Sequence, residues 1–176
     1  MITIPKNWKP AGAGEEEIPY ILFDVQSSTT TANTVLNFFS RAEAAQNKRT
    51  TNMPLASQLP PSQRFLITKI ELAGDSEFST ATDQSDVFDG GSLELTIAKK
   101  RYLHADLRAF LGTGMRLPPG VTNVDETFAG PGYVPDQGIT IPGGVEFNVE
   151  VITGDTSPTA AQQLTVRLHG ILVRPA

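Results

Sequence analysis

The stretch Gln163–Pro175 reads Gln-Leu-Thr-Val-Arg-Leu-His-Gly-Ile-Leu-Val-Arg-Pro, and it decides the fold class. Leu164, Val166 and Leu168 alternate with polar residues. Successive side chains of a β-strand point to opposite faces of a sheet, so this alternation predicts a strand with one buried face. Short runs of the same kind, separated by Gly, Pro, Asp and Ser, extend back to Arg64. The chain is therefore predicted to be all-β.

The other apolar runs predict the remaining strands. Predicted strands cover residues 18–26, 34–39, 64–73, 92–103, 138–141, 145–153 and 164–173. Helical pattern is confined to short pieces at 41–48 and 104–111 and to one turn in the polar loop 74–91, while 115–138 is predicted to be irregular. Seven or eight strands with so little helix predict a single jelly-roll or β-sandwich barrel of about eight strands with short helical insertions.

The chain length favours one domain. With 176 residues, of which 39% are hydrophobic, it is long enough for one substantial core and short for two. Residues 1–17 are rich in Pro and Gly and are predicted to form an extended N-terminal arm, with a single jelly-roll domain over 18–176. The arm has no apolar run of signal-peptide length, so we expect no classical secretion.

Charge and cysteine content exclude several classes of function. The net charge is -5, so the chain lacks the basic surface that binding to phosphate backbones requires, and we expect no direct binding to nucleic acid. Cysteine is absent, which excludes disulfides, thiolate metal sites and a cysteine nucleophile.

Residues with catalytic chemistry are few. The only histidines are His104 and His169, and they do not form the close His-x-His pair that a cupin metal site needs. Asp83, Asp86 and Asp89 lack the spacing of an EF-hand, so a solvated loop is expected there, with a bound cation as the open alternative. No phosphate-binding loop or nucleophile elbow is present. We expect no catalytic residues, no metal, no cofactor and no small-molecule substrate, hence not an enzyme.

Two charged segments and one aromatic residue are candidates for contacts between subunits. The candidate contact residues are Trp8, Glu15, Glu16, Glu17, Lys99, Lys100 and Arg101. A Trp on a polar arm either folds back over its own domain or anchors the arm in a neighbour. Lys99-Lys100-Arg101, the basic run, would contact Glu15-Glu16-Glu17, the acidic triplet, of another subunit. Alternatively, the basic run is a solvated strand end.

Several segments together resemble a known family. They are Asn37-Phe38-Phe39, Thr51-Asn52-Met53, Gln58-Leu59-Pro60, Gln63-Arg64-Phe65-Leu66-Ile67, Leu93-Glu94-Leu95-Thr96-Ile97-Ala98 and Phe147-Asn148-Val149-Glu150-Val151. In this arrangement the chain is similar to the small major capsid protein of tailless icosahedral bacteriophages with an internal membrane, of the type that infects Thermus and has relatives infecting halophilic archaea.

The resemblance implies a viral structural protein. It implies a vertical jelly roll that forms at least dimers, packs with a second, larger capsid protein into capsomers, and lies above a lipid membrane. The expected location is the virion, with assembly in the host cytoplasm. No catalytic residues come with the resemblance.

The alternative function is a non-catalytic carbohydrate-binding β-sandwich module. Such a module stacks aromatic side chains on sugar rings. The aromatic residues available for stacking are Trp8, Tyr20, Tyr102 and Tyr133, and they share no evident strand face.

Overall fold

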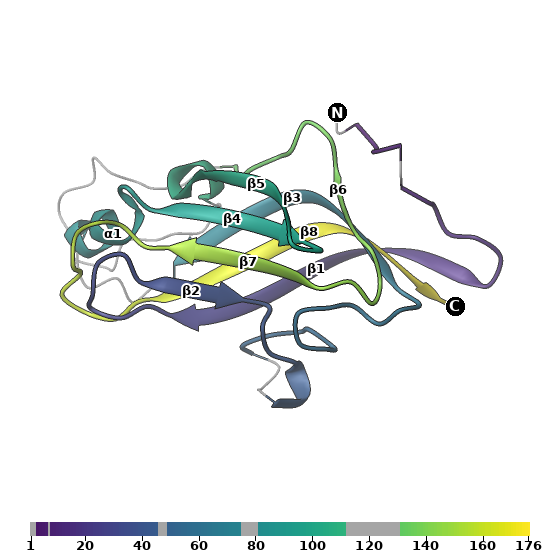
Figure 1. Ribbon diagram of the computed structural model, residues 1–176, viewed down its shortest axis with the longest axis horizontal. Coiled ribbons are helices and arrows are strands. Elements are labelled where there is room, and N and C mark those ends of the chain that lie inside the picture. The colour runs from purple at the N-terminus through teal and green to yellow at the C-terminus, as the bar shows by residue number, and fades with distance from the viewer. Residues whose placement is uncertain (1–2, 7, 46–48, 75–80, 112–130) are drawn as a thin grey trace.

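The structure is a sandwich of two four-stranded antiparallel sheets, which confirms the predicted all-β fold (Figure 1). This computed structural model describes residues 3–6, 8–45, 49–74, 81–111 and 131–176. The strands are β1 (Glu15–Ser27), β2 (Val35–Phe38), β3 (Arg64–Gly74), β4 (Ser92–Ile97), β5 (Lys100–Asp106), β6 (Ile139–Ile141), β7 (Phe147–Ile152) and β8 (Gln163–Pro175). Helix α1 covers Ala81–Phe88, and two 3-10 helices cover Glu43–Ala45 (η1) and Leu107–Phe110 (η2).

The order of the strands is that of a jelly roll. One sheet has the order β1-β8-β3-β6 and the other β2-β7-β4-β5. Strand β1 pairs with β8, β2 with β7, β3 with β6 and β4 with β5, all antiparallel. This pairing is that of one long hairpin rolled into a barrel. Its outermost pair, β1 and β8, lies in one sheet, and its innermost pair, β4 and β5, lies in the other.

The core lies between the two sheets and follows the alternation of the sequence. Leu164, Val166 and Leu168 are fully buried, and β4 and β7 show the same alternation of buried and half-buried residues. The largest fully buried side chains are Phe38, Phe39, Phe65, Phe88, Phe110 and Phe147. Six buried rings from both sheets and from the connections tie the two layers together.

Gly170 interrupts the apolar alternation of β8 for a steric reason. A Cβ atom at this position would lie 1.9 Å from the carbonyl oxygen of Leu66 on the neighbouring strand β3. The register between β3 and β8 shifts close by, between Ile67 and Lys69. A glycine is needed where the bulged strand brings its backbone this close.

The prediction of one strand over residues 92–103 is wrong. Two strands, β4 and β5, are joined there by a two-residue turn at Ala98 and Lys99, whose φ angles are 50° and 64°. A positive φ at both central residues is typical of a type I′ hairpin turn, which Asn-Gly usually marks. Neither residue at this turn favours positive φ, so the sequence carries no signal for it. The predicted helix at 104–111 is shortened to η2 because β5 extends to Asp106.

The other predicted segments have mixed outcomes. Strand β1 begins at Glu15, inside the predicted arm, and so the arm is shorter than 1–17. The loop 74–91 contains the eight residues of α1, more helix than the single turn expected. Helical pattern at 41–48 is realised only as η1, and residues 46–48 lie outside the described residues, as does most of the predicted irregular segment 115–138.

A buried carboxylate connects the two sheets at the end of β1. Asp24 Oδ2 accepts hydrogen bonds from the backbone N–H of Phe39, at 2.7 Å, and from Gln26 Nε2, at 3.1 Å. Its other oxygen, Oδ1, is buried without a hydrogen-bond partner. Burial raises the pKa of Asp24 above its ordinary value, and the hydrogen bonds from Phe39 and Gln26 and the charge of Arg41 oppose that shift without cancelling it.

The raised pKa predicts the effect of removing the charge. Because the pKa of Asp24 is raised in the folded state, its protonated form stabilises the fold. This contribution is complete when the pH is below the ordinary pKa of 3.8, and it is lost as the pH rises through the folded-state pKa. Asp24→Asn keeps an acceptor for Phe39 and should match or exceed the wild-type stability at pH 7 in urea unfolding, with no gain at pH 3. Asp24→Ala leaves the Phe39 N–H unpaired and should cost about 1–3 kcal/mol. Equal losses for both variants would contradict this assignment.

The hairpin turn predicts a stabilising substitution. Replacing Ala98-Lys99 by Asn-Gly provides residues that adopt positive φ with less strain, so the double variant A98N/K99G should gain about 1 kcal/mol in urea unfolding. The matched control is Lys99→Gln, which removes the same charge and leaves a non-glycine residue in the turn. A gain in the control as large as in the double variant would show that charge, not backbone strain, is the cause.

Candidate functional site

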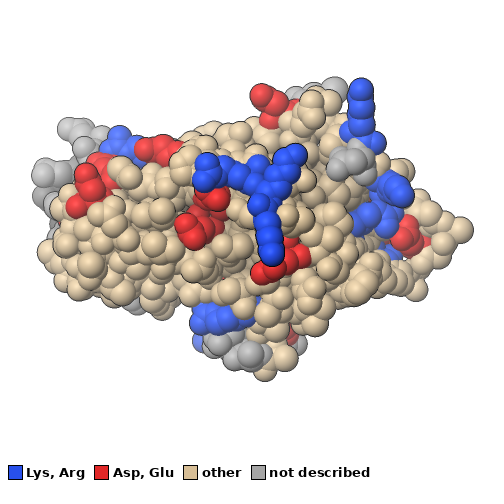
Figure 2. All heavy atoms as spheres, viewed as in Figure 1, with Lys and Arg blue, Asp and Glu red and all other residues tan. Residues whose placement is uncertain are grey.

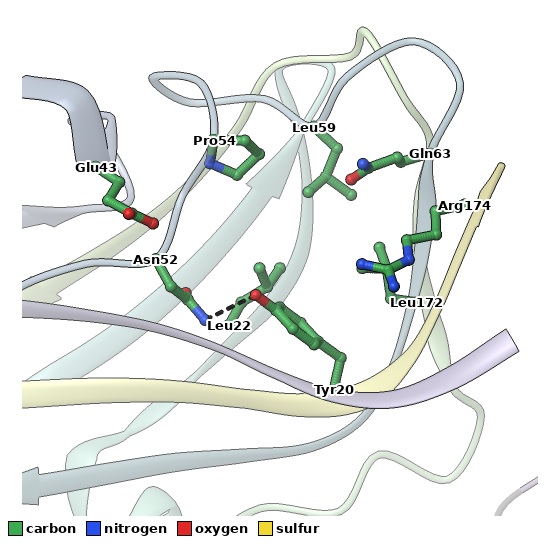
Figure 3. A pocket seen from close by; sticks show the side chains of 9 residues that line it. All are labelled: Tyr20, Leu22, Glu43, Asn52, Pro54, Leu59, Gln63, Leu172 and Arg174. Atoms are coloured by element: carbon green, nitrogen blue, oxygen red, sulfur yellow. Dashed lines mark hydrogen bonds between the residues drawn. The ribbon is translucent and has the colours of Figure 1, made fainter. Parts of the chain in front are cut away.

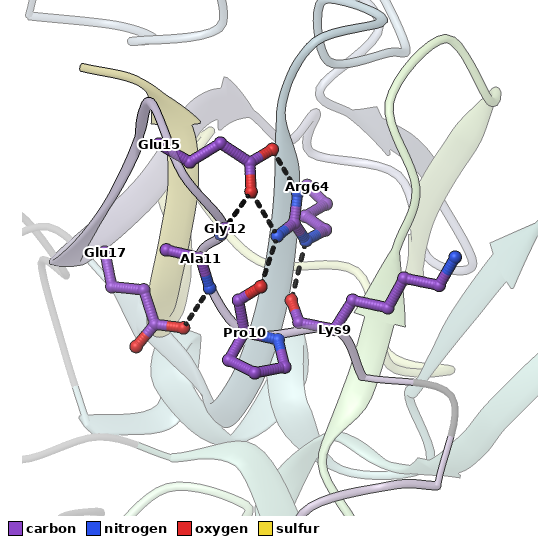
Figure 4. Close-up of polar contacts among 7 residues, drawn as sticks. All are labelled: Lys9, Pro10, Ala11, Gly12, Glu15, Glu17 and Arg64. Carbon is purple, nitrogen blue, oxygen red and sulfur yellow. Dashed lines mark hydrogen bonds and ion pairs between the residues drawn. The ribbon is translucent and has the colours of Figure 1, made fainter.

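Arg64, at the start of β3, holds the N-terminal arm against the domain (Figure 4). Its Nε donates to the carbonyl of Lys9 at 2.7 Å, and one terminal nitrogen donates to that of Pro10 at 2.8 Å. Both terminal nitrogens also bind the carboxylate of Glu15, each at 2.8 Å. The guanidinium lies 5.9 Å from the centre of the Trp8 ring. The Arg64 side chain thus contacts the Trp8 ring, the carbonyls of Lys9 and Pro10, and the carboxylate of Glu15. Through these contacts Trp8 folds back over its own domain.

The charge on Glu15 is stabilised by these contacts. Hydrogen bonds from Arg64 and from the backbone N–H of Gly12 lower the pKa of Glu15 to about 2. Because the pKa of Glu15 is lowered in the folded state, its ionised form stabilises the fold. This contribution is complete when the pH is above the ordinary pKa of 4.5, and it is lost as the pH falls through about 2. The contact is therefore complete at neutral pH.

All three residues of the acidic triplet have partners within the same chain. Besides Glu15, Glu16 binds Arg174 Nε at 2.6 Å and Glu17 accepts a hydrogen bond from the N–H of Ala11 at 2.9 Å. Through these contacts the triplet, at the start of β1, connects the arm to β1 and β1 to β8. The contact of the triplet with the basic run of another subunit stays a prediction.

The basic run lies on a different part of the molecule. Lys99 is in the β4–β5 turn, while Lys100 and Arg101 begin β5. The amino group of Lys100 lies 5.6 Å from the centre of the Tyr102 ring, and Arg101 Nε binds Glu94 at 2.7 Å. Figure 2 looks onto the β2-β7-β4-β5 sheet and shows Lys and Arg side chains gathered over this end of it.

Each histidine lies beside a carboxylate on the outside of a sheet. His169 Nε2 is 2.8 Å from Glu71 Oε2, and Lys69 Nζ is 3.3 Å from Glu71 Oε1. Burial would raise the pKa of Glu71, but the hydrogen bonds from His169 and Lys69 outweigh it and hold that pKa below its ordinary value. On the other sheet, His104 Nδ1 is 3.5 Å from Glu94 Oε2.

The pair of Glu71 and His169 was not predicted. The two residues are 98 positions apart and come together only because β3 and β8 are neighbours. Among the residues described, no three His, Asp or Glu side chains are grouped as metal ligands would be. Asp89 of the acidic loop binds Arg108 Nε at 2.7 Å, and the side chain of Asp83 lies outside the described residues.

A small cavity opens between the end of the β1–β8 pair and the segment that precedes β3 (Figure 3). Its volume is about 200 Å³, with Leu22, Leu59 and Leu172 as apolar lining and Tyr20 and Asn52 among the polar groups. Ligand pockets usually have roughly 300–1,000 Å³. A second, more open hollow of about 420 Å³ lies under the arm. Neither histidine lines either cavity.

The four candidate sugar-stacking residues do not share a platform. Trp8 lies against Arg64, Tyr20 packs on the core and Tyr133 packs on the Phe110 ring at 5.2 Å. Tyr102 is exposed on β5. The three tyrosines thus have separate structural surroundings.

The edges of both sheets are protected. At the β1 edge the side chain of Asn52 takes the place of a neighbouring strand: Oδ1 accepts from Phe23 N at 2.9 Å and Nδ2 donates to Ile21 O at 2.7 Å. Pro19 has no N–H to offer at this edge. Strand β5 carries a bulge and begins with two cations, and β2 and β6 are only four and three residues long. Bulges, cations and short strands all disfavour edge pairing.

The outward side of strand β1 differs in polarity from the outward face of the other sheet. On the β2-β7-β4-β5 sheet the outward side chains are mostly polar, namely Asn37, Ser92, Glu94, Thr96, His104, Asn148 and Glu150. On β1 the residues that alternate with the core are Pro19, Ile21, Phe23 and Val25, and none of them belongs to the core cluster. A face exposed to water is normally polar, so the outward face of β1 is the candidate functional surface.

Comparisons with protein families and with curated proteins find no match to this chain. In the part of the chain that the structure describes, no helix is long and apolar enough to cross a membrane.

The arm contact predicts a change in fluorescence. Trp8 is the single tryptophan, so its emission reports whether the arm is in place. Arg64→Gln removes the ion pair with Glu15 and the cation above the ring, and we expect Trp8 emission to shift to longer wavelength, with faster proteolysis between residues 8 and 14. The control is Arg174→Gln, which breaks only the exposed pair with Glu16. An unchanged spectrum in Arg64→Gln would contradict the role of Arg64.

Proposed function

We propose that this protein is a viral structural protein, a major capsid protein subunit that self-associates and packs with a second capsid protein to form an icosahedral shell. The observation that carries the proposal is a jelly roll whose outward face on β1 is apolar. Jelly rolls are the fold of many viral capsid proteins, and also of lectins and cupins, so the fold alone is an analogy. The apolar outward face adds a reason for association.

The arm and the edges support the same function. Arg64 binds the carbonyls of Lys9 and Pro10 and so holds the N-terminal segment, in which Lys9 and Pro10 are exposed, against the domain. Because the edges are protected, subunits would associate through faces, loops and the arm rather than by open-ended strand addition. Face contacts allow a closed shell to form without fibrous growth.

In this role the partners are further copies of the chain, at least as a dimer, together with the second capsid protein. The protein would be found in the virion after assembly in the host cytoplasm, with an internal lipid membrane beneath the shell. Its net charge of -5 disfavours direct contact with nucleic acid. The segments that resemble the phage capsid family add to this proposal; the scattered aromatic residues do not favour the carbohydrate-binding alternative.

The proposed function predicts self-association. Sedimentation velocity of the full chain from about 5 μM to 1 mM should show a mass that rises to a dimer or larger, with discrete species rather than a continuous series. A protein that stays monomeric throughout and is not recruited by any candidate shell protein would contradict the proposal. A glycan-array screen with specific hits would instead support a carbohydrate-binding module.

A further inference from the structure

The outward side chains of β1 form an apolar line along one face of the β1-β8-β3-β6 sheet. We name Pro19, Ile21, Phe23 and Val25 the β1 strip. Ile21 is 43% exposed and Pro19 is exposed, while Phe23 and Val25 are half-buried. Adjacent inward residues such as Leu22 are buried, so the strip contributes nothing to the core of its own domain.

The apolar surface continues onto the neighbouring strand β8. In the sheet register Pro19 lies opposite Ile171 of β8, which in turn lies opposite Leu66 of β3. Ile171 is half-buried and Leu66 is buried, so the apolar surface extends from the β1 strip to β8 and ends there. Contiguous apolar surface of this kind marks an interaction site, whereas isolated exposed residues do not.

The two ends of the β1 strip carry opposite charges. Glu17 is exposed and precedes the strip in the same outward alternation. Towards the other end Phe23 lies opposite Arg167 of β8, whose side chain is 38% exposed and lies 3.9 Å from Glu71 Oε2 of its own chain. If two strips lie antiparallel about Ile21, Arg167 of each copy lies over Pro19 of the other, two residues from Glu17. The surface is therefore complementary to itself, and complementary charges fix the orientation of association.

We infer that a second copy of this chain docks on the β1 strip about a two-fold axis close to Ile21, with the two strips antiparallel and face to face. This inference rests on the proposed function and specifies which surface joins the subunits. Two-fold contacts use the same patch on both copies, and a patch with opposite charges at its ends satisfies that requirement. Ile21 meets Ile21 of the second copy, and Pro19 approaches Phe23.

The size of the face sets the expected strength. Strands β1 and β8 have 13 residues each, which at about 3.3 Å per residue gives a length of roughly 40 Å. Two strands spaced about 4.8 Å apart then offer a face of roughly 400 Å². Standard interfaces bury about 800 Å² on each partner, so this contact belongs with the weaker ones. Association in the micromolar range is expected.

The first test places a charge on the strip. Ile21→Asp should raise the dimer dissociation constant at least tenfold in sedimentation equilibrium, because each dimer would bury two carboxylates. The matched control is Val35→Asp on the polar outward side of the other sheet, where Val35 is 51% exposed. It should leave the dissociation constant unchanged. Urea unfolding of both variants checks that neither has lost its fold.

The second test uses the absence of cysteine. In Ile21→Cys the only disulfide available joins two copies, and a two-fold axis at Ile21 brings the two sulfur atoms within bonding range. Mild oxidation should produce a covalent dimer in high yield, and Val35→Cys should remain monomeric on denaturing gels.

The outcomes separate this inference from the proposed function. If the wild type associates but Ile21→Asp associates equally well, or if Val35→Cys cross-links and Ile21→Cys does not, the β1 strip is not the interface and the capsid role still stands. If the wild type is monomeric at every concentration, the inference falls together with self-association. Binding of the wild type to anionic vesicles that Ile21→Asp abolishes, without any dimer, would assign the strip to lipid and overturn the inference.

Discussion

The pairing of β1 with β8 is the constraint on which the rest of the structure depends. All thirteen residues of β8 pair with β1, and ten of the same strand's residues pair with β3 on the other side. The first and last strands of the domain are therefore neighbours, and the sheet is complete only when the last strand has been added. Gly170 allows the close approach of β3 to this central strand. Because these contacts join distant parts of the sequence, the domain is expected to fold slowly and cooperatively.

Alternation of residue types predicted most of the strands because it records burial on one face. Leu164, Val166 and Leu168 are an example, and all three are buried. The turn at Ala98 and Lys99 was missed because its positive φ angles are imposed by the surrounding hairpin and not favoured by these residues. Local pattern carries no information of that kind.

The candidate contacts show a second limit of the sequence. The sequence gives no sign that Glu15 binds Arg64, which is 49 positions away, or that the acidic triplet Glu15–Glu17 holds the arm to its own domain. The pair of Glu71 and His169 depends equally on the β3–β8 register. The sequence predicts a strand over 18–26, but both sides of that strand are apolar, so the sequence does not show which side faces the core. The sheet order places the second sheet on the side of Leu22 and leaves Ile21 and Phe23 on the outer side.

The proposed capsid role rests on that apolar outer side of β1, since contiguous apolar surface outside the core favours association. A structure of the associated protein by electron cryo-microscopy tests this most directly. Two copies related by a two-fold axis, with their β1 strands antiparallel and Ile21 at the axis, are the predicted result. Associated subunits whose β1 faces are open to solvent, with contacts elsewhere, would contradict it.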